Sequence, residues 1–565
     1  MSLCPTTPSP ESESRQFNRR SLLKVGGVML GAGALVESFA TAAHAATISY
    51  TDDGTNYVVN TGANLVFKVN HRNGDLVSFV YRGVEYQGYG KNSQVESGLG
   101  ASTVTISATS SVVVVTVVHG TLVHYYVARA GENNIYMWSY KDADSVRMQR
   151  FIVRLKPGAF TFSGGDAWNS ATSTTIEAGD IFKATDGSTH SKHYSGVRTM
   201  DYDYVGATNA AKTVGIWLAR SNREKSSGGP FFRSLLRSGS TRSPDLYEIV
   251  YYGMAQTEEH RWGLNGPYVL AFTDGGAPSS ALFARNLKTG FANSLGLKGF
   301  VGASGRGRVT GVGIAGRDTA YPYTVGFANG DAQYWAVADG ARGHFNCPNM
   351  LPGTYAMTIY KGELAVWTGS ASVGAGGTTA LHTITISKDP SKAAAIWRIG
   401  DWNGTPSGFK NAALVTHAHP SDVRAGVWTG NFTVGTSAVG DFPCYLWNDV
   451  NDGLQIKFKL TAAQAALAHT LRIGITSSLA GGRPRVSVND WTSPIPPAPS
   501  SAKTRSLTVG TYRGFNTLLT YAIPARAWQS DVSRWNILTL NIISGSKGSG
   551  FLNPGVAFDC LDLLA

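Results

Sequence analysis

Two arginines four residues apart, Arg150 and Arg154, are the first side chains in the sequence with a clear chemical use. They flank Phe151-Ile152-Val153, a run typical of a strand. In a strand, both arginines and Ile152 point to one side and the other two residues to the core, with the arginine Cα atoms about 13 Å apart. Guanidinium groups bind carboxylates through paired N–H groups, so this spacing suits successive negative charges on an extended ligand. The structural alternative is a solvated sheet face with intramolecular ion pairs.

A second candidate is Lys192, which stands between His190 and His193 in a polar loop that begins at Thr189. Neighbouring cations or burial lower the pKa of a lysine from its usual ~10.4, and the neutral amine can then act as a base. The alternative is a lysine that only keeps the surface soluble.

A tyrosine-rich strand is expected around Tyr247, Tyr251 and Tyr252. Tyrosine rings stack on sugars and their hydroxyls form hydrogen bonds, although aromatic strands also form plain core. The preceding glycine-rich loop, residues 226–230, lacks the Lys-Ser/Thr ending of a phosphate-binding loop, so it does not indicate nucleotide binding.

Metal and thiol chemistry have weaker signals. His417 and His419, with Asp422 close by, could place ligands on one side of a strand, but Pro420-Ser421-Asp422 is more typical of a turn. Removal of the N-terminal segment takes away Cys4 and leaves Cys347, Cys444 and Cys560, which are far apart and include no Cys-x-x-Cys pair. At most one disulfide could form among them, and buried free thiols are the favoured alternative.

The elements that must hold these side chains are strands. With 66 glycines, 11% aromatic and only 15% charged residues in 565, the chain is typical of a turn-rich all-β protein of several domains. This composition excludes a coiled coil, a collagen-like chain and a helical bundle. Strands are predicted over 112–118 and 134–140, and the one plausible helix is Thr461 to Leu471.

The N-terminus predicts export. Arg19-Arg20 with Leu22-Leu23-Lys24 is typical of a twin-arginine signal, and Ala43-His44-Ala45 offers a cleavage site, so we expect a signal peptide over 1–45. An anchor helix is the alternative, but about twelve apolar residues are too short for a hydrocarbon core of ~30 Å. We therefore expect no membrane insertion after cleavage and a secreted or periplasmic protein.

The mature chain from Ala46 keeps a formal charge of +11, without a DNA-binding motif. Such a balance suggests a polyanion met outside the cytoplasm, such as an acidic polysaccharide, and no nucleic-acid partner; solubility alone is the other explanation. Breaks near residues 302 and 390 divide the chain into three parts. We expect a large β-sandwich over 46–302 that carries the candidate catalytic residues named above, a small seven-stranded sandwich over 303–390, and a jelly roll over 391–565.

Taken in order, these segments resemble the rhamnogalacturonan lyases of polysaccharide lyase family 4. The similarity spans nearly the whole mature chain. The matching text is Arg150-Phe151-Ile152-x-Arg154-Leu155, Asp186-Gly187-Ser188-Thr189-x-Ser191-Lys192-x-Tyr194-Ser195, Ser226-Ser227-Gly228-Gly229-Pro230-Phe231-Phe232-Arg233, Gln256-Thr257-Glu258, Gly263-Leu264-x-Gly266-Pro267-Tyr268, Pro352-Gly353-Thr354-Tyr355, Tyr360-Lys361-Gly362-Glu363-Leu364, Ile399-Gly400-Asp401-Trp402-x-Gly404-Thr405-Pro406-x-Gly408-Phe409 and His419-Pro420-Ser421-Asp422.

The resemblance implies a galactose-mutarotase-like sandwich, a fibronectin-III-like domain and a carbohydrate-binding jelly roll. It also implies β-elimination in the rhamnose–galacturonic acid backbone of pectin, an acidic plant cell-wall polysaccharide. By the family's pattern Lys192 is catalytic, Arg150 and Arg154 bind the acidic backbone, and Glu224 and Tyr247 belong to the cleft. We add His193 and Tyr252 as candidate substrate contacts. We expect a monomer that needs no cofactor for catalysis, and the jelly roll leaves room for a structural calcium ion.

One departure from the family's pattern bears on activity. Before Gln256-Thr257-Glu258 the family usually carries a catalytic histidine, and this chain has Met254, whose thioether neither donates nor accepts a proton usefully. Ile249 and Asn265 also stand where the family usually has a tyrosine and a histidine. Either His193, Tyr251, Tyr252 or His260 supplies the missing function, or the substrate is a different uronate-containing glycan, or the protein binds without turnover.

A non-catalytic polysaccharide-binding protein is thus the main alternative to a lyase. A sugar epimerase or glycoside hydrolase on the same sandwich would need paired carboxylates or a His/Glu pair in the cleft, and no such pair is clearly placed in the sequence.

Overall fold

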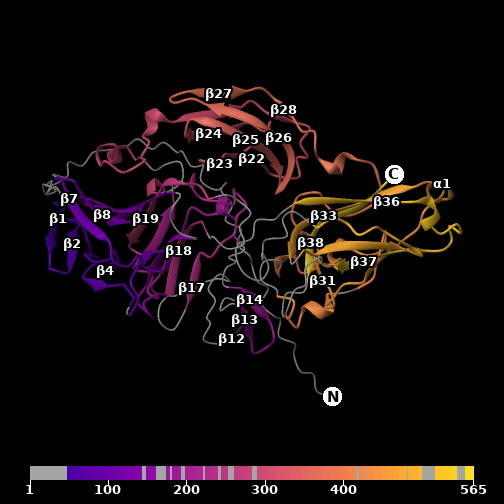
Figure 1. Cartoon of the computed structure of the whole chain (residues 1–565), viewed down its shortest axis with the longest axis horizontal. Helices are drawn as coiled ribbons and strands as arrows, with labels where there is room; N and C mark the ends of the chain where they lie inside the picture. The colour runs from indigo at the N-terminus through magenta and orange to yellow at the C-terminus, as the bar shows by residue number, and fades with distance from the viewer. Residues whose placement is uncertain are drawn as a thin grey trace, which may run out of the picture. The chain divides into compact units, whose positions relative to one another are not determined.

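The computed structural model describes residues 47–88, 90–142, 148–160, 173–177, 181–191, 197–220, 223–239, 244–251, 260–282, 289–414, 419–428, 430–479, 481–498, 516–543 and 554–565. Within these residues nearly all regular structure is β-strand, and the one α-helix is α1 (Ala462–Ala465). The predicted all-β class is therefore confirmed. Figure 1 shows the strands in three groups that follow one another along the colour ramp, β1–β19, β20–β28 and β29–β38.

The first group is built on a seven-stranded antiparallel sheet. Its order is β15 (Tyr204–Thr208), β16 (Gly215–Arg220), β19 (Gly263–Thr273), β10 (Asn134–Lys141), β9 (Leu122–Arg129), β8 (Val112–His119), β7 (Thr103–Ala108). A four-stranded sheet has the order β17 (Arg237–Gly239), β18 (Pro244–Tyr251), β11 (Gln149–Arg154), β6 (Gln94–Val95). A five-stranded sheet runs through β1 (Ser49–Asp52), β2 (Asn56–Asn60), β3 (Leu65–Asn70), β4 (Leu76–Tyr81) and β5 (Val84–Glu85).

The core of this sandwich lies between these sheets. Val113 and Val115 of β8, Phe67 of β3 and Phe151 and Val153 of β11 belong to one buried cluster. The intervening Val112 and Val114 belong to a second cluster on the other face of the seven-stranded sheet, which also contains Leu282, Ala292 and Leu297. Burial on both faces explains why the first four residues of this strand are all valine.

A smaller three-stranded sheet stands apart from the large ones in its hydrogen bonding. It consists of β12 (Ser173–Glu177), β13 (Ile181–Ala184) and β14 (Thr189–Ser191), paired antiparallel. The turn between β13 and β14 contains Gly187 at φ +83°, a conformation that favours glycine. Strand β14 ends one residue before Lys192.

The second group forms a small sandwich. One sheet has the order β23 (Gln333–Val337), β22 (Tyr323–Ala328), β25 (Gly353–Lys361), β26 (Leu364–Val373). The other strands are β24 (Phe345–Met350), β20 (Gly307–Gly311) and β27 (Thr378–Leu381), with the pair β21 (Ile314–Ala315) and β28 (Ile384–Thr385). Tyr355, Met357 and Ile359 alternate along β25 and enter a core of their own.

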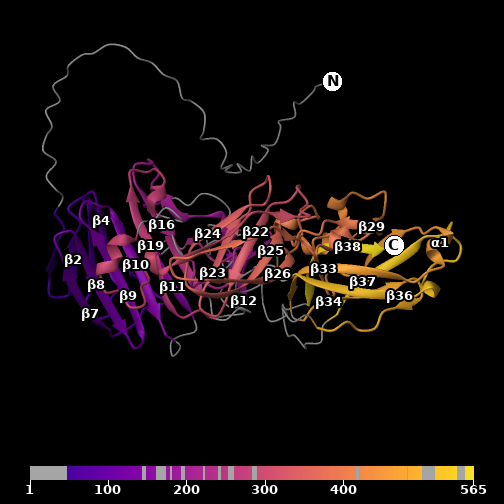
Figure 2. The same ribbon diagram turned by 90° about the horizontal axis from the view of Figure 1, so that it is seen from above.

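The third group consists of two facing sheets around the largest aromatic cluster of the described chain. One has the order β29 (Ala395–Gly400), β38 (Gly555–Leu564), β33 (His469–Leu479), β36 (Thr517–Ile523), with β31 (Tyr445–Trp447) also on β38. The other has the order β30 (Phe432–Thr433), β32 (Leu454–Phe458), β37 (Asn536–Ile543), β34 (Arg483–Val488), β35 (Trp491–Thr492). Figure 2 shows β33 and β36 of the first sheet and β34 and β37 of the second running in similar directions.

The predicted helix over Thr461–Leu471 is wrong in length. Thr461 caps α1 as a capping box with Gln464, but the helix ends at Ala465 and β33 begins at His469. The residues from His469 onward pair with β36 and β38 instead, because these pairings bury an apolar strand that a surface helix would leave half exposed.

Two further sequence-based expectations can be checked directly. Cys347, Cys444 and Cys560 form no disulfide and are buried, which confirms the prediction of buried free thiols. Among the described residues, no helix has the length and apolar character needed to cross a bilayer.

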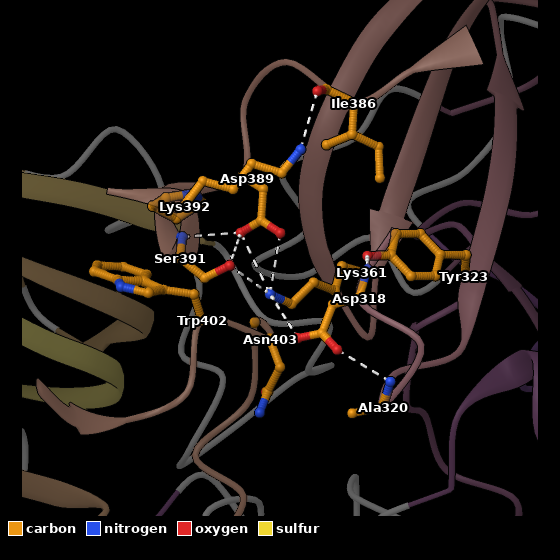
Figure 3. Close-up of polar contacts among 12 residues, drawn as sticks. Asp318, Ala320, Tyr323, Lys361, Ile386, Asp389, Ser391, Lys392, Trp402 and Asn403 are labelled. Atoms are coloured by element: carbon orange, nitrogen blue, oxygen red, sulfur yellow. Dashed lines mark hydrogen bonds and ion pairs between the residues drawn. The ribbon is translucent and has the colours of Figure 1, made fainter. Parts of the chain in front are cut away.

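Where the second group meets the third, a buried ammonium joins the two. Figure 3 shows Lys361 of β25 directed at Asp389 and Ser391, with Asp318 and Asn403 nearby. Lys361 Nζ lies 3.1 Å from Asp389 Oδ2 and 3.0 Å from Ser391 Oγ, and its side chain is 1% exposed. At the same junction Glu363 N donates to Asn403 O at 2.8 Å.

Candidate active site

The pairing of β11 with β18 fixes one face of the four-stranded sheet. Arg150, Ile152 and Arg154 lie opposite Ile249, Tyr247 and Asp245 in register. Ile152, Tyr247 and Ile249 form a small buried cluster of their own, whereas Phe151 and Val153 enter the main core. The two arginines therefore share one face whose reverse is core, as their spacing predicts.

Arg154 has an internal partner. Its Nη1 forms an ion pair with Oδ2 of Asp245, and both side chains are nearly buried, at 11% and 6% exposed. The Tyr247 hydroxyl donates to the same Asp245 oxygen at 3.1 Å and lies 3.2 Å from Ser238 Oγ. Burial, with the adjacent Asp245 charge, raises the pKa of Tyr247 to about 12, so the phenol keeps its proton at neutral pH.

Asp245 was not singled out in the sequence, although a signal for it exists. It stands two residues before Tyr247, so in a strand the two side chains share a face. An acidic side chain on the face that carries two guanidinia is the natural partner for one of them.

Arg150 is held by backbone and hydroxyl oxygens. Its Nε donates to Glu96 O at 3.1 Å and its Nη2 to Ser97 Oγ at 2.7 Å. Glu96 has φ +58°, an unusual value for a residue with a side chain, and its carboxylate pairs with the buried Lys141. Burial lowers the pKa of Lys141, while Glu96 opposes that shift. Both of these contacts of Arg150 are with uncharged oxygens.

A histidine lies at the same end of β11. His260 Nε2 is 3.1 Å from Gln149 Oε1, and its ring stacks on Tyr251 at 4.2 Å between centroids. Burial, with Lys141 nearby, lowers the pKa of His260 to about 4, so the imidazole is neutral at pH 7. Two of the four candidates for the missing histidine, His260 and Tyr251, are thus in contact beside the residue that precedes Arg150.

Several predicted residues lie outside the described part of the chain. These are Lys192, His193, Tyr252 and Met254. Their assignments therefore stay predictions. His417 is in the same position, and within the described residues no group of three or more His, Cys, Asp and Glu side chains could hold a metal ion.

Glu224 lies elsewhere, at the junction with the second domain. Its carboxylate accepts from Arg306 Nη1 and Nη2 at 2.7 and 3.0 Å and from the Tyr334 hydroxyl. The side chain is 4% exposed. Arg306 and Tyr334 thus bind both carboxylate oxygens, which is the geometry of an interdomain ion pair, whereas the β11–β18 face carries Arg150, Arg154 and Tyr247.

Two motifs noted separately in the sequence meet in space. Thr189 at the start of β14 contacts Asp422 through both its N–H and its hydroxyl, at 2.8 and 2.9 Å. Their separation of 233 residues gave no sequence signal for this contact. The turn at His419–Asp422 therefore belongs to a contact between the first and third domains.

Comparison with known proteins agrees with this architecture. A family model described as "Rhamnogalacturonan lyase B, N-terminal" matches residues 48–299. Models described as "Polysaccharide lyase family 4, domain II" and "Polysaccharide lyase family 4, domain III" match residues 305–381 and 395–563, and they are of fibronectin-III and carbohydrate-binding-module type, as expected for the second and third domains.

Similar curated proteins cover nearly the same length. Rhamnogalacturonate lyase A of Emericella nidulans is 39% identical over 525 residues, which is 92% of this chain and 96% of that protein. Rhamnogalacturonate lyase A of Aspergillus aculeatus is 39% identical over 532 residues, 93% and 97% of the two chains. A putative rhamnogalacturonase of Neurospora crassa is 36% identical over 92% of this chain and 96% of its own. The chain is a polysaccharide lyase and belongs to polysaccharide lyase family 4.

Proposed function

We propose that this lyase cleaves the rhamnose–galacturonic acid backbone of rhamnogalacturonan by β-elimination, with Lys192 as the base and Arg150 and Arg154 as partners of uronate carboxylates. The names of the similar proteins support the substrate. The observation that carries the role of the arginines is the β11–β18 register, which puts both guanidinia and the Tyr247 hydroxyl on one face of a strand pair.

The chemistry explains why cations are needed. A guanidinium beside the uronate carboxylate stabilises the negative charge that develops when the C5 proton is removed. The Lys192 amine takes that proton, the C5–H electron pair forms a C4–C5 double bond, and the C4–O bond breaks with its electrons on the departing oxygen. That oxygen then takes up a proton, so atoms and charge balance without a cofactor.

Binding without turnover is the second candidate, and Met254 in place of the family's usual histidine favours it. The same cationic face would then retain acidic glycans without an elimination step. We also propose that the chain acts outside the cytoplasm, exported by the twin-arginine signal over residues 1–45.

Lys192→Ala tests the assignment of the base. We expect it to abolish the rise in ultraviolet absorbance of the unsaturated uronate when the protein is incubated with rhamnogalacturonan, while the thermal unfolding midpoint is kept. Lys91→Ala, at an exposed lysine of the same domain, serves as the matched control and should keep full turnover. An unchanged rate in Lys192→Ala would remove that residue from the mechanism.

Arg150→Met tests the carboxylate role separately. Loss of a charge that binds the uronate should raise KM at least tenfold, since a charge-assisted hydrogen bond contributes about 1.5–3 kcal/mol. If the wild-type protein is retained on acidic glycans in affinity electrophoresis but releases no unsaturated product from any of them, binding alone is the function.

A further inference from the structure

The hairpin β13–β14, which leads into Lys192, is held by the third domain. Asp422 Oδ2 accepts from Thr189 N at 2.8 Å and from Thr189 Oγ1 at 2.9 Å. The Thr189 hydroxyl in turn accepts from His419 N at 2.8 Å. One threonine of the first domain therefore exchanges three hydrogen bonds with a single turn of the third.

The acceptor in this contact is fixed in place. The Asp422 side chain is fully buried, and Arg424 binds both its oxygens, with Nε 2.8 Å from Oδ1 and Nη2 2.6 Å from Oδ2. Asp422 Oδ1 also accepts from Arg424 N at 2.9 Å. The hydrogen bonds and the Arg424 charge hold the pKa of Asp422 below its usual range although burial opposes them, so the carboxylate is ionised at neutral pH.

The rest of the hairpin is also in contact with that turn. Lys183 Nζ on β13 donates to Ser421 O at 3.2 Å, and Val423 N donates to Gly187 O at 3.3 Å. A Cβ on Gly187 would lie 2.1 Å from Val423 Cγ1, so a larger residue there would have to displace the Val423 side chain. Both strands and the turn between them are therefore held.

We propose that the third domain positions the catalytic base, with Asp422 and Thr189 as the positioning residues that fix the strand from which Lys192 continues. The proposal rests on the proposed function of Lys192. Thr189 precedes Lys192 by three residues, so a displacement at Thr189 is passed along the chain to the base. A domain otherwise expected to bind carbohydrate thereby takes part in the chemical step.

Such positioning matters because proton transfer is sensitive to the distance between the base and the proton. A base must approach the C5 proton to within hydrogen-bond reach, and a misplacement of about 1 Å costs on the order of 100-fold in rate. Loops hold such geometry less well than strands with fixed partners. A buried carboxylate from another domain, which accepts two hydrogen bonds from Thr189, gives this hairpin of two short strands a fixed partner.

Thr189→Val is the main test, because valine keeps the shape and removes the hydroxyl. We expect kcat on rhamnogalacturonan to fall at least tenfold with KM within about twofold, since binding through Arg150 and Arg154 is unaffected. The acid limb of kcat/KM, which reports the ionisation of the base in the free enzyme, should also shift in pH. Thr189→Ser, which keeps the hydroxyl, should restore both quantities.

Two further variants complete the design. Asp422→Asn should reproduce the Thr189→Val effects and replaces it if that variant does not fold. Asn516→Ala removes a hydrogen bond of the third domain that goes elsewhere, from Asn516 Nδ2 to Glu363 O at 2.8 Å, and should leave kcat and the acid limb as in wild type.

The outcomes separate this proposal from the one it rests on. If Lys192→Ala is inactive while Thr189→Val and Asp422→Asn keep the wild-type acid limb and kcat, positioning by the third domain is overturned and the role of Lys192 stands. If Asn516→Ala shifts the limb as much as Thr189→Val does, the effect is general loosening and the proposal fails. If Lys192→Ala turns over normally, both assignments fail.

Discussion

At the scale of single residues, Asp245 orients the side chains of the cationic face formed by β11 and β18. Its carboxylate binds the Arg154 guanidinium and accepts from the Tyr247 hydroxyl, so both groups have a fixed direction before any ligand arrives. Arg154 already has an anionic partner in Asp245. Arg154 would then act mainly through the donors that Asp245 leaves over.

Asp245→Asn should destabilise the protein by about 3 kcal/mol, because it leaves the nearly buried Arg154 charge without a counter-ion. Urea unfolding with a constant m-value would measure the loss. The double variant Arg154→Met/Asp245→Leu should be less destabilised than the single one, since it removes both charges. A single variant within about 0.5 kcal/mol of wild type would show that the pair is solvated and weak.

At the scale of elements, the segment from Glu224 to Arg233 joins the first domain to the second. Arg233 binds both oxygens of Glu363 at 3.2 and 2.7 Å, and Phe231 packs edge-on against Tyr360 at 5.0 Å. Gly228 has φ +94°, and a Cβ there would lie 2.3 Å from the Phe232 ring. The glycines of this loop therefore allow close packing at a domain junction. This role explains a glycine-rich composition without phosphate binding.

Glu224→Gln tests that interpretation. Removing the charge leaves Arg306, whose side chain is only 13% exposed, without its carboxylate partner. We expect a loss of about 3–5 kcal/mol in the free energy of unfolding, seen by calorimetry as a transition at lower temperature. Asp201→Asn is the control, because its partner Arg198 is partly exposed and the pair should contribute at most about 1 kcal/mol. If Glu224→Gln raised KM and left stability unchanged, Glu224 would belong to the substrate cleft, as the family's pattern implies.

How far the sequence predicts these elements depends on how local their causes are. The apolar run of β8 is a local pattern that burial alone explains, and this strand was predicted from the sequence. The helix after Thr461 began at its predicted cap and ended early, because strand pairing of β33 overrode a propensity worth a few tenths of a kcal/mol per residue.

The site divides in the same way. The shared face of Arg150 and Arg154 follows from the two-residue repeat of a strand and was predictable. The docking of Glu224 onto Arg306 and of Thr189 onto Asp422 depends on side chains 82 and 233 residues apart, which no local pattern couples. Only a folded chain shows such contacts.

At the scale of the whole molecule, each pair of domains is in direct contact. Glu224 and Arg306 join the first to the second, Glu363 and Asn403 the second to the third, and Thr189 and Asp422 the first to the third. Each domain contacts both of the others in addition to its covalent linkers. We therefore expect a loss of stability at one junction to lower the stability of the other two domain junctions as well. A group at a junction that titrates near neutral pH would then make the free energy of unfolding of the whole chain depend on pH.

Asp559 on β38 is such a group. Its Oδ1 accepts from Asn403 N at 3.1 Å and from Gly404 N at 2.7 Å, directly beside the contact of Asn403 with Glu363. Burial raises the pKa of Asp559 to about 7, although these hydrogen bonds oppose the shift. In the unfolded chain the same carboxyl titrates near 3.8, so between those values folding takes up a proton and loses stability as the pH rises.

Asp559→Asn should therefore flatten the pH dependence of stability. The variant keeps an acceptor for Asn403 and Gly404 but cannot ionise, so relative to it wild type should lose on the order of 1 kcal/mol per pH unit from about pH 4 to 7, and little more above. Urea unfolding at pH 4.5, 5.5, 6.5 and 7.5 measures the difference, and all other titrating groups cancel in it. Asp490→Asn, at an exposed residue of the same domain, should show no such trend. A constant difference across these values would mean that Asp559 ionises in the folded protein as readily as in the unfolded chain, and the third domain would then hold its junction equally well at every pH.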